Sequence, residues 1–581
     1  MHIRIGNASV RTRRSLTNYL RLFGVLLLWC GECGLRRDNH SVATAGDTIR
    51  CHNGAVVCVS APASEVGLSV LKRGGTAIDA AVATAFALAV TYPPAGNIGG
   101  GGFMIVVPRN SPALAYDFRE TAPAAATPTM FVDPQLRTPH RRVGVPGTVH
   151  GLALAHQRGG RIDWQVLVRP AVQLARDGFE IDQPLAESLN TILKSSDQQT
   201  FRELHRVFGK SDGTPWQRGD RLVQPDLALT LERIATQGPD GFYSGATADL
   251  FVAEMQRGGG LVTHADLKAY QPKCREPLRG TYRGFEIIGM PPPSSGGTTL
   301  IEMLNVLETF QLDSERYSAR NLHLTVEAMK RAYRDRARYL GDPDHVSIPA
   351  KLVTKEYARE VAAGIDPLQA TPSADLAGDI PLAAESPQTT HLSVVDKEGT
   401  AVSLTYTLES SYGSRVVVPG AGFLLNDEMN DFAWLPGVTD SSGRIGTAAN
   451  QIVPGKRMLS SMSPTVVLRD NQPVLITGSP GGRTIINTVL CVVMNTIDFK
   501  MDVRAAVDAP RLHHPWFPDA IRVEADLASR YPQALEQLRR LGHTISESEH
   551  QGDAHSIAID PDTREITAAA DGRISGRAAG Y

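Results

Sequence analysis

The chain has almost no excess of charge of either sign. Among its 581 residues, 59 lysines and arginines balance 61 aspartates and glutamates, and the formal net charge is -2. The chain therefore has no excess of positive charge that would attract a nucleic acid. The basic run at 331–338 (RAYRDRAR) lies in a helical pattern and includes an aspartate, so we interpret it as a solvated helix face. A nucleic-acid-binding function is therefore not predicted.

Cysteine is also scarce, with six residues in the chain. Cys51 and Cys58 could form a disulfide in an oxidising compartment, but the cysteine and histidine spacings do not match a zinc site. The glycine-rich stretch at 96–103 (GNIGGGGF) lacks the GxxxxGK[ST] pattern of a phosphate-binding loop. The sequence therefore predicts no metal site and no nucleotide or other cofactor.

The N-terminal segment has only a short apolar run, Leu22 to Trp29, whereas a membrane-spanning helix needs about 20 apolar residues. Arginines precede this run and small residues follow it, an order that is typical of an export signal. We therefore expect residues 1–34 to direct export to the periplasm or the cell exterior. The Arg13-Arg14 pair indicates a twin-arginine signal, and Cys30 is a candidate for lipid attachment to the membrane. An unstructured tail is the alternative.

The secondary-structure pattern changes near residue 389. Before it, helical periodicity dominates, with segments at 76–90, 248–257, 298–310 and 323–340. After it, the pattern alternates as in strands, at 391–396, 401–408, 462–468 and 474–477. Residues 366–388 are rich in Pro, Ala, Ser and Asp, as in an accessible connection. These patterns predict a layered α+β fold that is assembled from both sides of this connection.

Thr389 stands where that connection passes into a strand (QTTHLSVVD, 388–396). If the backbone is cut before Thr389, the residue gains a free α-amino group beside its own hydroxyl. A nucleophile and a general base then lie on one residue, because an α-amine with a pKa of about 8 is partly unprotonated at neutral pH. Without such a cut, the two threonines would merely open a strand, in which β-branched residues fit well.

Eight motifs in order make the chain similar to a known family: GNIGGGGFM (96–104), YDFRETAP (116–123), MPPPSSGG (290–297), YLGDPD (339–344), TTHLSVVD (389–396), LLNDEMNDF (424–432), LSSMSPT (459–465) and GSPGG (478–482). The chain resembles the γ-glutamyltransferases, which are self-processing N-terminal nucleophile hydrolases. This resemblance implies an αββα sandwich built from two subunits. Cleavage between Gln388 and Thr389 would give a large subunit, 35–388, and a small subunit, 389–581, that remain associated as a heterodimer.

The resemblance also implies a reaction. Thr389 would attack the γ-amide of glutathione or a related γ-glutamyl compound, and water or the amine of an amino acid or dipeptide would resolve the acyl-enzyme. Thr407 matches the position whose hydroxyl supports the nucleophile. Gly481 and Gly482 match the pair whose backbone amides stabilise the oxyanion, and glycine permits the close backbone approach that this role needs.

The substrate has an α-carboxylate and an α-ammonium group, so its pocket must offer both signs of charge. By resemblance, Arg119 holds the carboxylate with hydroxyl help from Ser460 and Ser461, and a guanidinium suits this role because it binds carboxylates in a bidentate manner. Glu428 and Asp431 would receive the ammonium group.

Two positions depart from the commonest family pattern. Glu409 replaces a frequent asparagine, and an acid there can still face the ammonium group. In the stretch 436–450, where the family often presents a tyrosine on a lid, Thr439 to Gly443 (TDSSG) has none. Acceptor preference and the balance between transfer and hydrolysis are therefore open.

Three alternatives to this activity remain: a cephalosporin acylase, a poly-γ-glutamate processing enzyme, and an exported binding protein that retains the fold without turnover. Asp431 with the Ser460-Ser461 pair favours a free γ-glutamyl amino-acid end over the first two. The intact Thr389, Thr407 and glycine pair argue against the third, because a binding protein needs no nucleophile.

Overall fold

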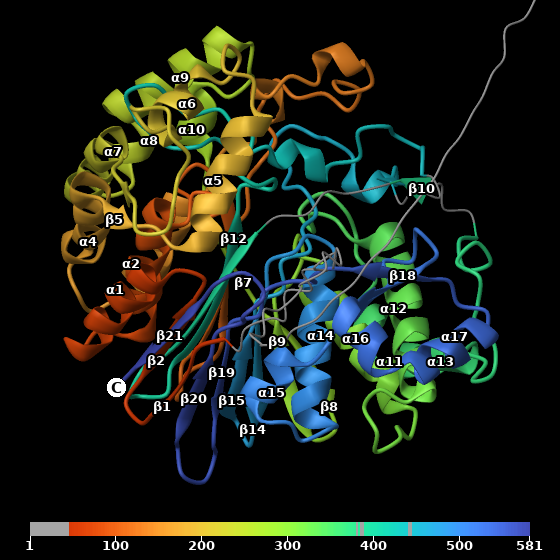
Figure 1. Cartoon of the computed structure of the whole chain (residues 1–581). Helices are drawn as coiled ribbons and strands as arrows, with labels where there is room; N and C mark the ends of the chain where they lie inside the picture. The colour runs from red at the N-terminus through yellow and green to blue at the C-terminus, as the bar shows by residue number, and fades with distance from the viewer. Residues whose placement is uncertain (1–45, 379–381, 384–388, 440–443) are drawn as a thin grey trace, which may run out of the picture. The chain divides into compact units, whose positions relative to one another are not determined.

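The computed structural model describes residues 46–378, 382–383, 389–439 and 444–581, which belong to a unit that spans residues 43–581 (Figure 1). The predicted export segment 1–34 with Cys30, residue Gln388, and positions 440–443 of the predicted lid lie outside the described residues. Among the helices of the described ranges, none combines the length and the apolar character needed to cross a lipid bilayer.

The first of two large sheets contains seven antiparallel strands. Its order is β21 (Arg577–Gly580), β2 (Ala55–Cys58), β11 (Thr390–Val395), β12 (Ala401–Thr407), β3 (Gly101–Val107), β4 (Leu114–Phe118) and β7 (Lys273–Arg275). The hairpin β11–β12 lies at the centre and is buried throughout, as its run of alternating β-branched residues favours. The predicted hairpin after Thr389 is thus present.

The second sheet is also seven-stranded and antiparallel. Its order is β1 (Thr48–Cys51), β20 (Ile566–Ala569), β19 (Ser556–Ile559), β15 (Gln472–Thr477), β14 (Thr465–Arg469), β9 (Phe285–Gly289) and β8 (Leu278–Tyr282). One apolar cluster joins the two sheets, with Phe103 and Ile105 from the first and Val466 and Ile476 from the second. The inner faces of the sheets therefore pack on each other.

Helices cover the two outer faces (Figure 1). The first sheet shares an apolar cluster with α1 (Ala61–Lys72), α2 (Ala77–Thr91), α3 (Thr148–Gly159), α4 (Trp164–Asp177), α5 (Gln183–Ser195), α6 (Arg202–Phe208), α7 (Pro225–Gln237), α8 (Asp240–Tyr243), α9 (Gly245–Gly258) and α10 (His264–Ala269). The second sheet shares one with α11 (Gly296–Glu308), α12 (Ala319–Tyr339), α13 (Lys355–Ala363), α14 (Thr484–Ile497), α15 (Val503–Asp508), α16 (Ala525–Arg530) and α17 (Pro532–Arg540). The layers follow the order αββα, which confirms the predicted fold class.

Small sheets complete the structure: β16 (Leu512–His513), β17 (Ile521–Glu524) and β18 (Ile545–Ser548) form one, β5 (Phe179–Glu180) pairs with β6 (Arg221–Leu222), and β10 (Leu382–Ala383) pairs with β13 (Arg444–Ile445). The apolar segment predicted at 76–90 is α2, and every side chain of this helix is buried. Thr76 begins it with a capping box, since its hydroxyl accepts from the Asp79 amide and the Asp79 carboxylate accepts from the Thr76 amide.

The interpretation of residues 331–338 as a solvated helix face is wrong. Arg331, Asp335 and Arg336 of α12 are only 1–3% exposed. The Arg331 guanidinium lies 2.5 Å from the Glu327 carboxylate and donates to the Gly364 carbonyl, while Arg336 donates to hydroxyl groups of neighbouring segments. These charges are tolerated inside because each has partners. Cys51 and Cys58, the pair considered for a disulfide, are free and buried in the described structure.

Candidate active site

The predicted nucleophile, Thr389, immediately precedes the strand β11. The register pairs Thr390 with Tyr406, and extending it by one residue sets Thr389 opposite Thr407. Both threonines are buried, at 5% and 2% exposure. Side chains alternate along a strand, so Thr389 shares the face of His391, whose ring packs against Gly478 of the neighbouring sheet: a Cβ on that glycine would lie 2.4 Å from the ring. Thr389 thus faces the region between the sheets where the GSPGG turn begins.

The glycine turn, residues 478–482 (GSPGG), connects β15 to α14. Gly481 has φ of 127° and Gly482 φ of 56°, a backbone region that favours glycine. A Cβ on Gly481 would lie 2.4 Å from the Thr484 hydroxyl, so a side chain is also excluded by space. The carbonyls of Gly481 and Gly482 accept the amides of Thr484 and Ile485, which begins α14. The turn therefore presents its backbone at the positive end of a helix dipole.

Arg119 follows β4 and is 1% exposed. Its Nη1 lies 2.5 Å from Glu428 Oε2, and its Nη2 pairs with Asp431. Both acids belong to a 3₁₀ helix over Glu428–Asp431, more than 300 residues away in the chain. Burial alone would lower the pKa of Arg119, but the acids raise it, so the guanidinium stays charged.

Glu409 joins this acidic group to the strand that carries Thr407. Its backbone amide donates to the Thr407 hydroxyl at 2.8 Å, and its carboxylate lies within 4.8 Å of those of Glu428 and Asp431. Its Oε1 has no hydrogen-bond partner within the described part of the chain. Burial first, and then repulsion by Asp431 and Glu428, raise the pKa of Glu409 well above its ordinary value. A cationic group of a ligand would relieve this repulsion.

The segment 459–461 borders Arg119 on another side. The guanidinium donates to the carbonyls of Met458 and Leu459, the residues just before the serine pair. Ser460 is fixed through its own carbonyl, which accepts from both the amide and the hydroxyl of Ser295 at 2.7 Å. The Ser461 hydroxyl accepts from Arg336 at 2.9 Å. The structure thus gathers Glu409, Glu428 and Asp431 around one buried guanidinium, and the serine pair directly follows the two residues whose carbonyls accept from it.

Sequence reasoning missed two charged residues at this site. Glu120 lies 3.4 Å from Arg119, and burial raises its pKa to about 8. Arg336, which positions Ser461, was assigned to the exposed run. A signal for it existed, because Arg336 falls on the helical stripe of apolar residues Leu322, Val326, Met329, Tyr333 and Leu340. Sequence periodicity therefore indicated a buried position, although the charge suggested an exposed one.

Two clusters of side chains have the composition of a metal site: Glu409 with Glu428 and Asp431, and His323 with Glu327 and His543. In each, at least one cationic side chain already pairs with carboxylates of the cluster. Arg119 pairs with the first cluster, while Lys330 and Arg331 pair with Glu327 in the second. We assign no metal ion to either cluster.

Comparison with known proteins identifies the family of this chain. The sequence model of gamma-glutamyltranspeptidase matches residues 63–581. The glutathione hydrolase proenzyme of Escherichia coli (strain K12) is 45% identical over 543 residues, which cover 92% of this chain and 93% of the relative. The chain belongs to the γ-glutamyltranspeptidase family. The glutathione hydrolase proenzyme of Pseudomonas aeruginosa is 43% identical over 534 residues, covering 90% of this chain and 93% of the relative.

Among solved structures, a cephalosporin acylase from Bacillus halodurans aligns with this γ-glutamyltranspeptidase family member at a TM-score of 0.81 and 26% identity, over 94% of this chain and 99% of the other. Its identity lies well below that of the glutathione hydrolase proenzymes. The predicted family and enzyme class are confirmed, so a binding protein without turnover is set aside. The acylase shares the fold, but the sequence is nearer to the glutathione hydrolases.

Proposed function

We propose that the protein is a self-processing γ-glutamyltransferase that takes the γ-glutamyl group from glutathione and related compounds, with Thr389 as its nucleophile. One observation carries the proposal. Thr389 immediately precedes a buried strand and lies opposite Thr407. The Thr407 hydroxyl accepts a hydrogen bond from the amide of Glu409, which belongs to the charged pocket around Arg119. The predicted nucleophile therefore lies close to a pocket that contains both positive and negative side chains, because Thr407 and Glu409 are only two residues apart.

Self-cleavage between Gln388 and Thr389 creates the catalytic base. Before the cut, the nitrogen of Thr389 is an amide; afterwards it is an amine that can take the hydroxyl proton. The products, 35–388 and 389–581, stay together because each of them contributes strands to both sheets. In the first sheet, β11 pairs with β2 and β12 pairs with β3; in the second, β14 pairs with β9.

The donor binds through its two charged groups. Arg119 receives the α-carboxylate with the Ser460 and Ser461 hydroxyls beside it, and Glu409, Glu428 and Asp431 receive the α-ammonium. On binding, part of the pairing between Arg119 and its acids is exchanged for pairing with the zwitterion. The pocket therefore selects a free amino-acid end rather than an uncharged acyl group, which favours this activity over that of a cephalosporin acylase.

The reaction has two halves. The Thr389 hydroxyl attacks the γ-carbonyl carbon and gives its proton to the α-amine, and the amides of Gly481 and Gly482 stabilise the oxyanion. The C–N bond of the donor then breaks, the leaving amine takes the proton, and a γ-glutamyl ester remains on Thr389. Water or the amine of an amino acid or dipeptide attacks the carbonyl carbon of this ester and gives a proton to the α-amine of Thr389. The ester C–O bond then breaks, the Thr389 oxygen takes up that proton, and glutamate or a new γ-glutamyl amide leaves. Thr407 supports the nucleophile through its hydroxyl.

The location of the protein follows from the N-terminal pattern. We infer export to the periplasm or the cell exterior from the arginines and the short apolar run within residues 1–34. Lipid attachment at Cys30 belongs to the same proposal.

The first prediction concerns processing and activity together. The purified protein should show two fragments on a denaturing gel, and Edman sequencing of the smaller one should begin Thr-Thr-His-Leu. It should release the anilide from a γ-glutamyl anilide, and glycylglycine should raise the rate only modestly, because the lid stretch lacks a tyrosine. An uncut chain that still releases the anilide would contradict the mechanism; a large acceleration by glycylglycine would contradict only the expected balance.

The second prediction concerns Glu409. A carboxyl whose pKa is raised in the folded state contributes stability at pH values below its unfolded pKa of about 4.3, and this stability is lost as the pH rises through the folded pKa. Glu409→Asn should therefore have the same Tm as the parent protein near pH 4 and a higher Tm at alkaline pH. It should also raise the KM for the donor, most strongly at high pH, because the ionised carboxylate faces the ammonium group. A Tm difference that does not change with pH would remove Glu409 from this role.

A further inference from the structure

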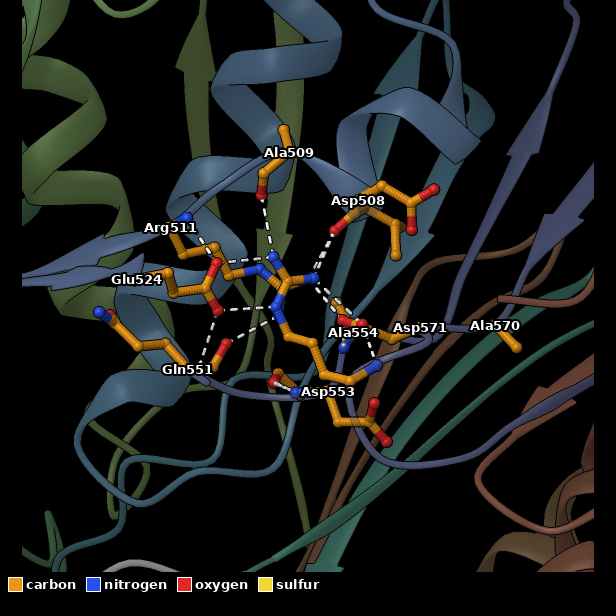
Figure 2. Close-up of polar contacts among 12 residues, drawn as sticks. Asp508, Ala509, Arg511, Glu524, Gln551, Asp553, Ala554, Ala570 and Asp571 are labelled. Atoms are coloured by element: carbon orange, nitrogen blue, oxygen red, sulfur yellow. Dashed lines mark hydrogen bonds and ion pairs between the residues drawn. The ribbon is translucent and has the colours of Figure 1, made fainter. Parts of the chain in front are cut away.

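A network of four charged side chains lies buried between α15, β17 and the C-terminal strands (Figure 2). Arg573 binds Glu524 through two parallel hydrogen bonds of 2.7 Å, and Arg511 Nη2 lies 2.5 Å from Asp571 Oδ2. Arg511 and Asp571 are 1% and 0% exposed. Two positive and two negative charges cancel, which makes burial of the whole group tolerable.

This network holds the segment 551–554 by its backbone (Figure 2). Arg511 Nη1 donates to the Gln551 carbonyl at 2.7 Å, and the Gln551 amide donates to Glu524 at 2.9 Å. The Ala554 amide donates to Asp571 Oδ2 at 2.7 Å. Hydrogen bonds with a charged partner are stronger than neutral ones, so both ends of the segment are firmly anchored.

The segment in turn contacts the glycine turn at two points. The Asp553 amide donates to the Ser479 hydroxyl at 2.9 Å. Gly552 packs so closely that a Cβ on it would lie 2.5 Å from Ser479 Oγ, and a Cβ on Gly481 would lie 3.3 Å from Gly552 Cα. The turn at 478–482 therefore rests on a support that the charged network fixes.

The Asp571 carboxyl keeps its negative charge at neutral pH. Burial alone would raise the pKa of Asp571, but the guanidinium groups of Arg511 and Arg573 hold it well below its ordinary value. The anchor for the Ala554 amide is thus a carboxylate at this pH.

We propose that Arg511 and Asp571 are positioning residues for oxyanion stabilisation: through the segment 551–554 and Ser479 they fix the turn that presents the Gly481 and Gly482 amides. The inference rests on the role proposed above for these two glycines. A buried ion pair is by itself weak evidence for stability, whereas a displacement of about 1 Å in catalytic geometry can cost about 100-fold in rate. The pair therefore acts on the chemical step rather than on substrate binding.

The test uses two variants of the full-length protein. One changes the charged network, and the other changes the glycine turn that this network supports. Asp571→Asn removes the charge that anchors Ala554, and Ser479→Ala removes the hydroxyl that accepts from the Asp553 amide and donates to the Pro480 carbonyl. We expect kcat per cut chain to fall by about 10- to 100-fold in the first and by a smaller factor in the second, with the KM for the γ-glutamyl anilide nearly unchanged. Slower cleavage at Thr389 should accompany the fall in Asp571→Asn.

A second readout separates positioning from general stability. A γ-glutamyl boronate forms a tetrahedral adduct like the reaction intermediate, whereas L-glutamate occupies only the donor pocket. In both variants the affinity for the boronate should weaken in parallel with kcat/KM, while the affinity for glutamate stays constant. The control is Glu327→Gln, an equally buried acid that pairs with Arg331 and contacts the Thr371 amide; it should lower Tm and leave kcat unchanged.

Three outcomes would overturn the inference. If Asp571→Asn and Ser479→Ala lower Tm but keep the parent kcat and boronate affinity, the network is only structural. If Asp571→Asn fails to fold, a Ser479→Ala variant with parent kcat and boronate affinity likewise shows a purely structural network. If the parent protein itself is uncut and releases no anilide, the proposed function fails, and the positioning role fails with it.

Discussion

Replacing Thr389 with alanine should leave a single uncut chain without measurable release from a γ-glutamyl anilide. The variant lacks the hydroxyl that attacks the peptide bond before it, so the α-amine is never generated. Loss of a nucleophile and its base as a unit typically removes about 10⁴-fold or more of the rate. Gel analysis after prolonged incubation and an anilide assay measure both effects.

Two further substitutions sharpen this test. Thr389→Ser retains a hydroxyl and should restore slow cleavage and part of the activity. Thr390→Val changes the adjacent β-branched residue, whose hydroxyl has no hydrogen-bond partner within the described residues, and should be cut and active like the parent. Normal cleavage of Thr389→Ala would refute the assigned role, because the bond would then be cut by another agent.

Arg119→Ala should produce the second large effect, a rise in the donor KM of about 100-fold or more, since removing one partner of a buried charge pair costs about 2–5 kcal/mol in binding. Stability should fall as well. Glu428, Asp431 and Glu120 would lose the guanidinium that lies among them, and an uncompensated buried charge costs about 3–5 kcal/mol. Donor kinetics and thermal unfolding measure the two consequences.

Arg119→Lys is the matched control. It keeps the positive charge, so much of the stability should return. It loses the planar fork that binds a carboxylate through two parallel hydrogen bonds, so the KM should remain raised. An unchanged KM in Arg119→Ala would exclude the residue from the donor pocket, whatever happens to stability.

Local patterns predicted the parts of the fold that depend on neighbours in the sequence. Alternation after residue 389 predicted the strands that form the hairpin β11–β12, and helical periodicity at 76–90 predicted α2. The charged pocket needed more than pattern. Arg119 and Glu428 lie on opposite sides of the chain's midpoint, and they meet because β4 pairs with β3 and β3 pairs with β12. Only the resemblance to a family linked these residues in advance.

The sequence patterns did not predict which charged residues are buried. Arg336, Arg511 and Asp571 are of residue types that are usually exposed. Their burial depends on partners in segments that are distant in the sequence. Hydrophobic periodicity treats every charged residue as polar, and it does not predict whether an oppositely charged residue will pair with it in the fold. Arg336 alone carried a readable sign, its position on the apolar stripe of α12.

Each sheet contains strands from both sides of residue 389, and this has a consequence for the physical state of a cleaved protein. Cutting the backbone changes a unimolecular folding problem into a bimolecular one without changing the native contacts. Neither polypeptide contains all the strands of either sheet, and each of the three large apolar clusters takes residues from both polypeptides. Once denatured, they must find each other again, and recovery depends on their concentration. In the proposed mechanism, the cut that creates the catalytic amine therefore also makes refolding dependent on protein concentration.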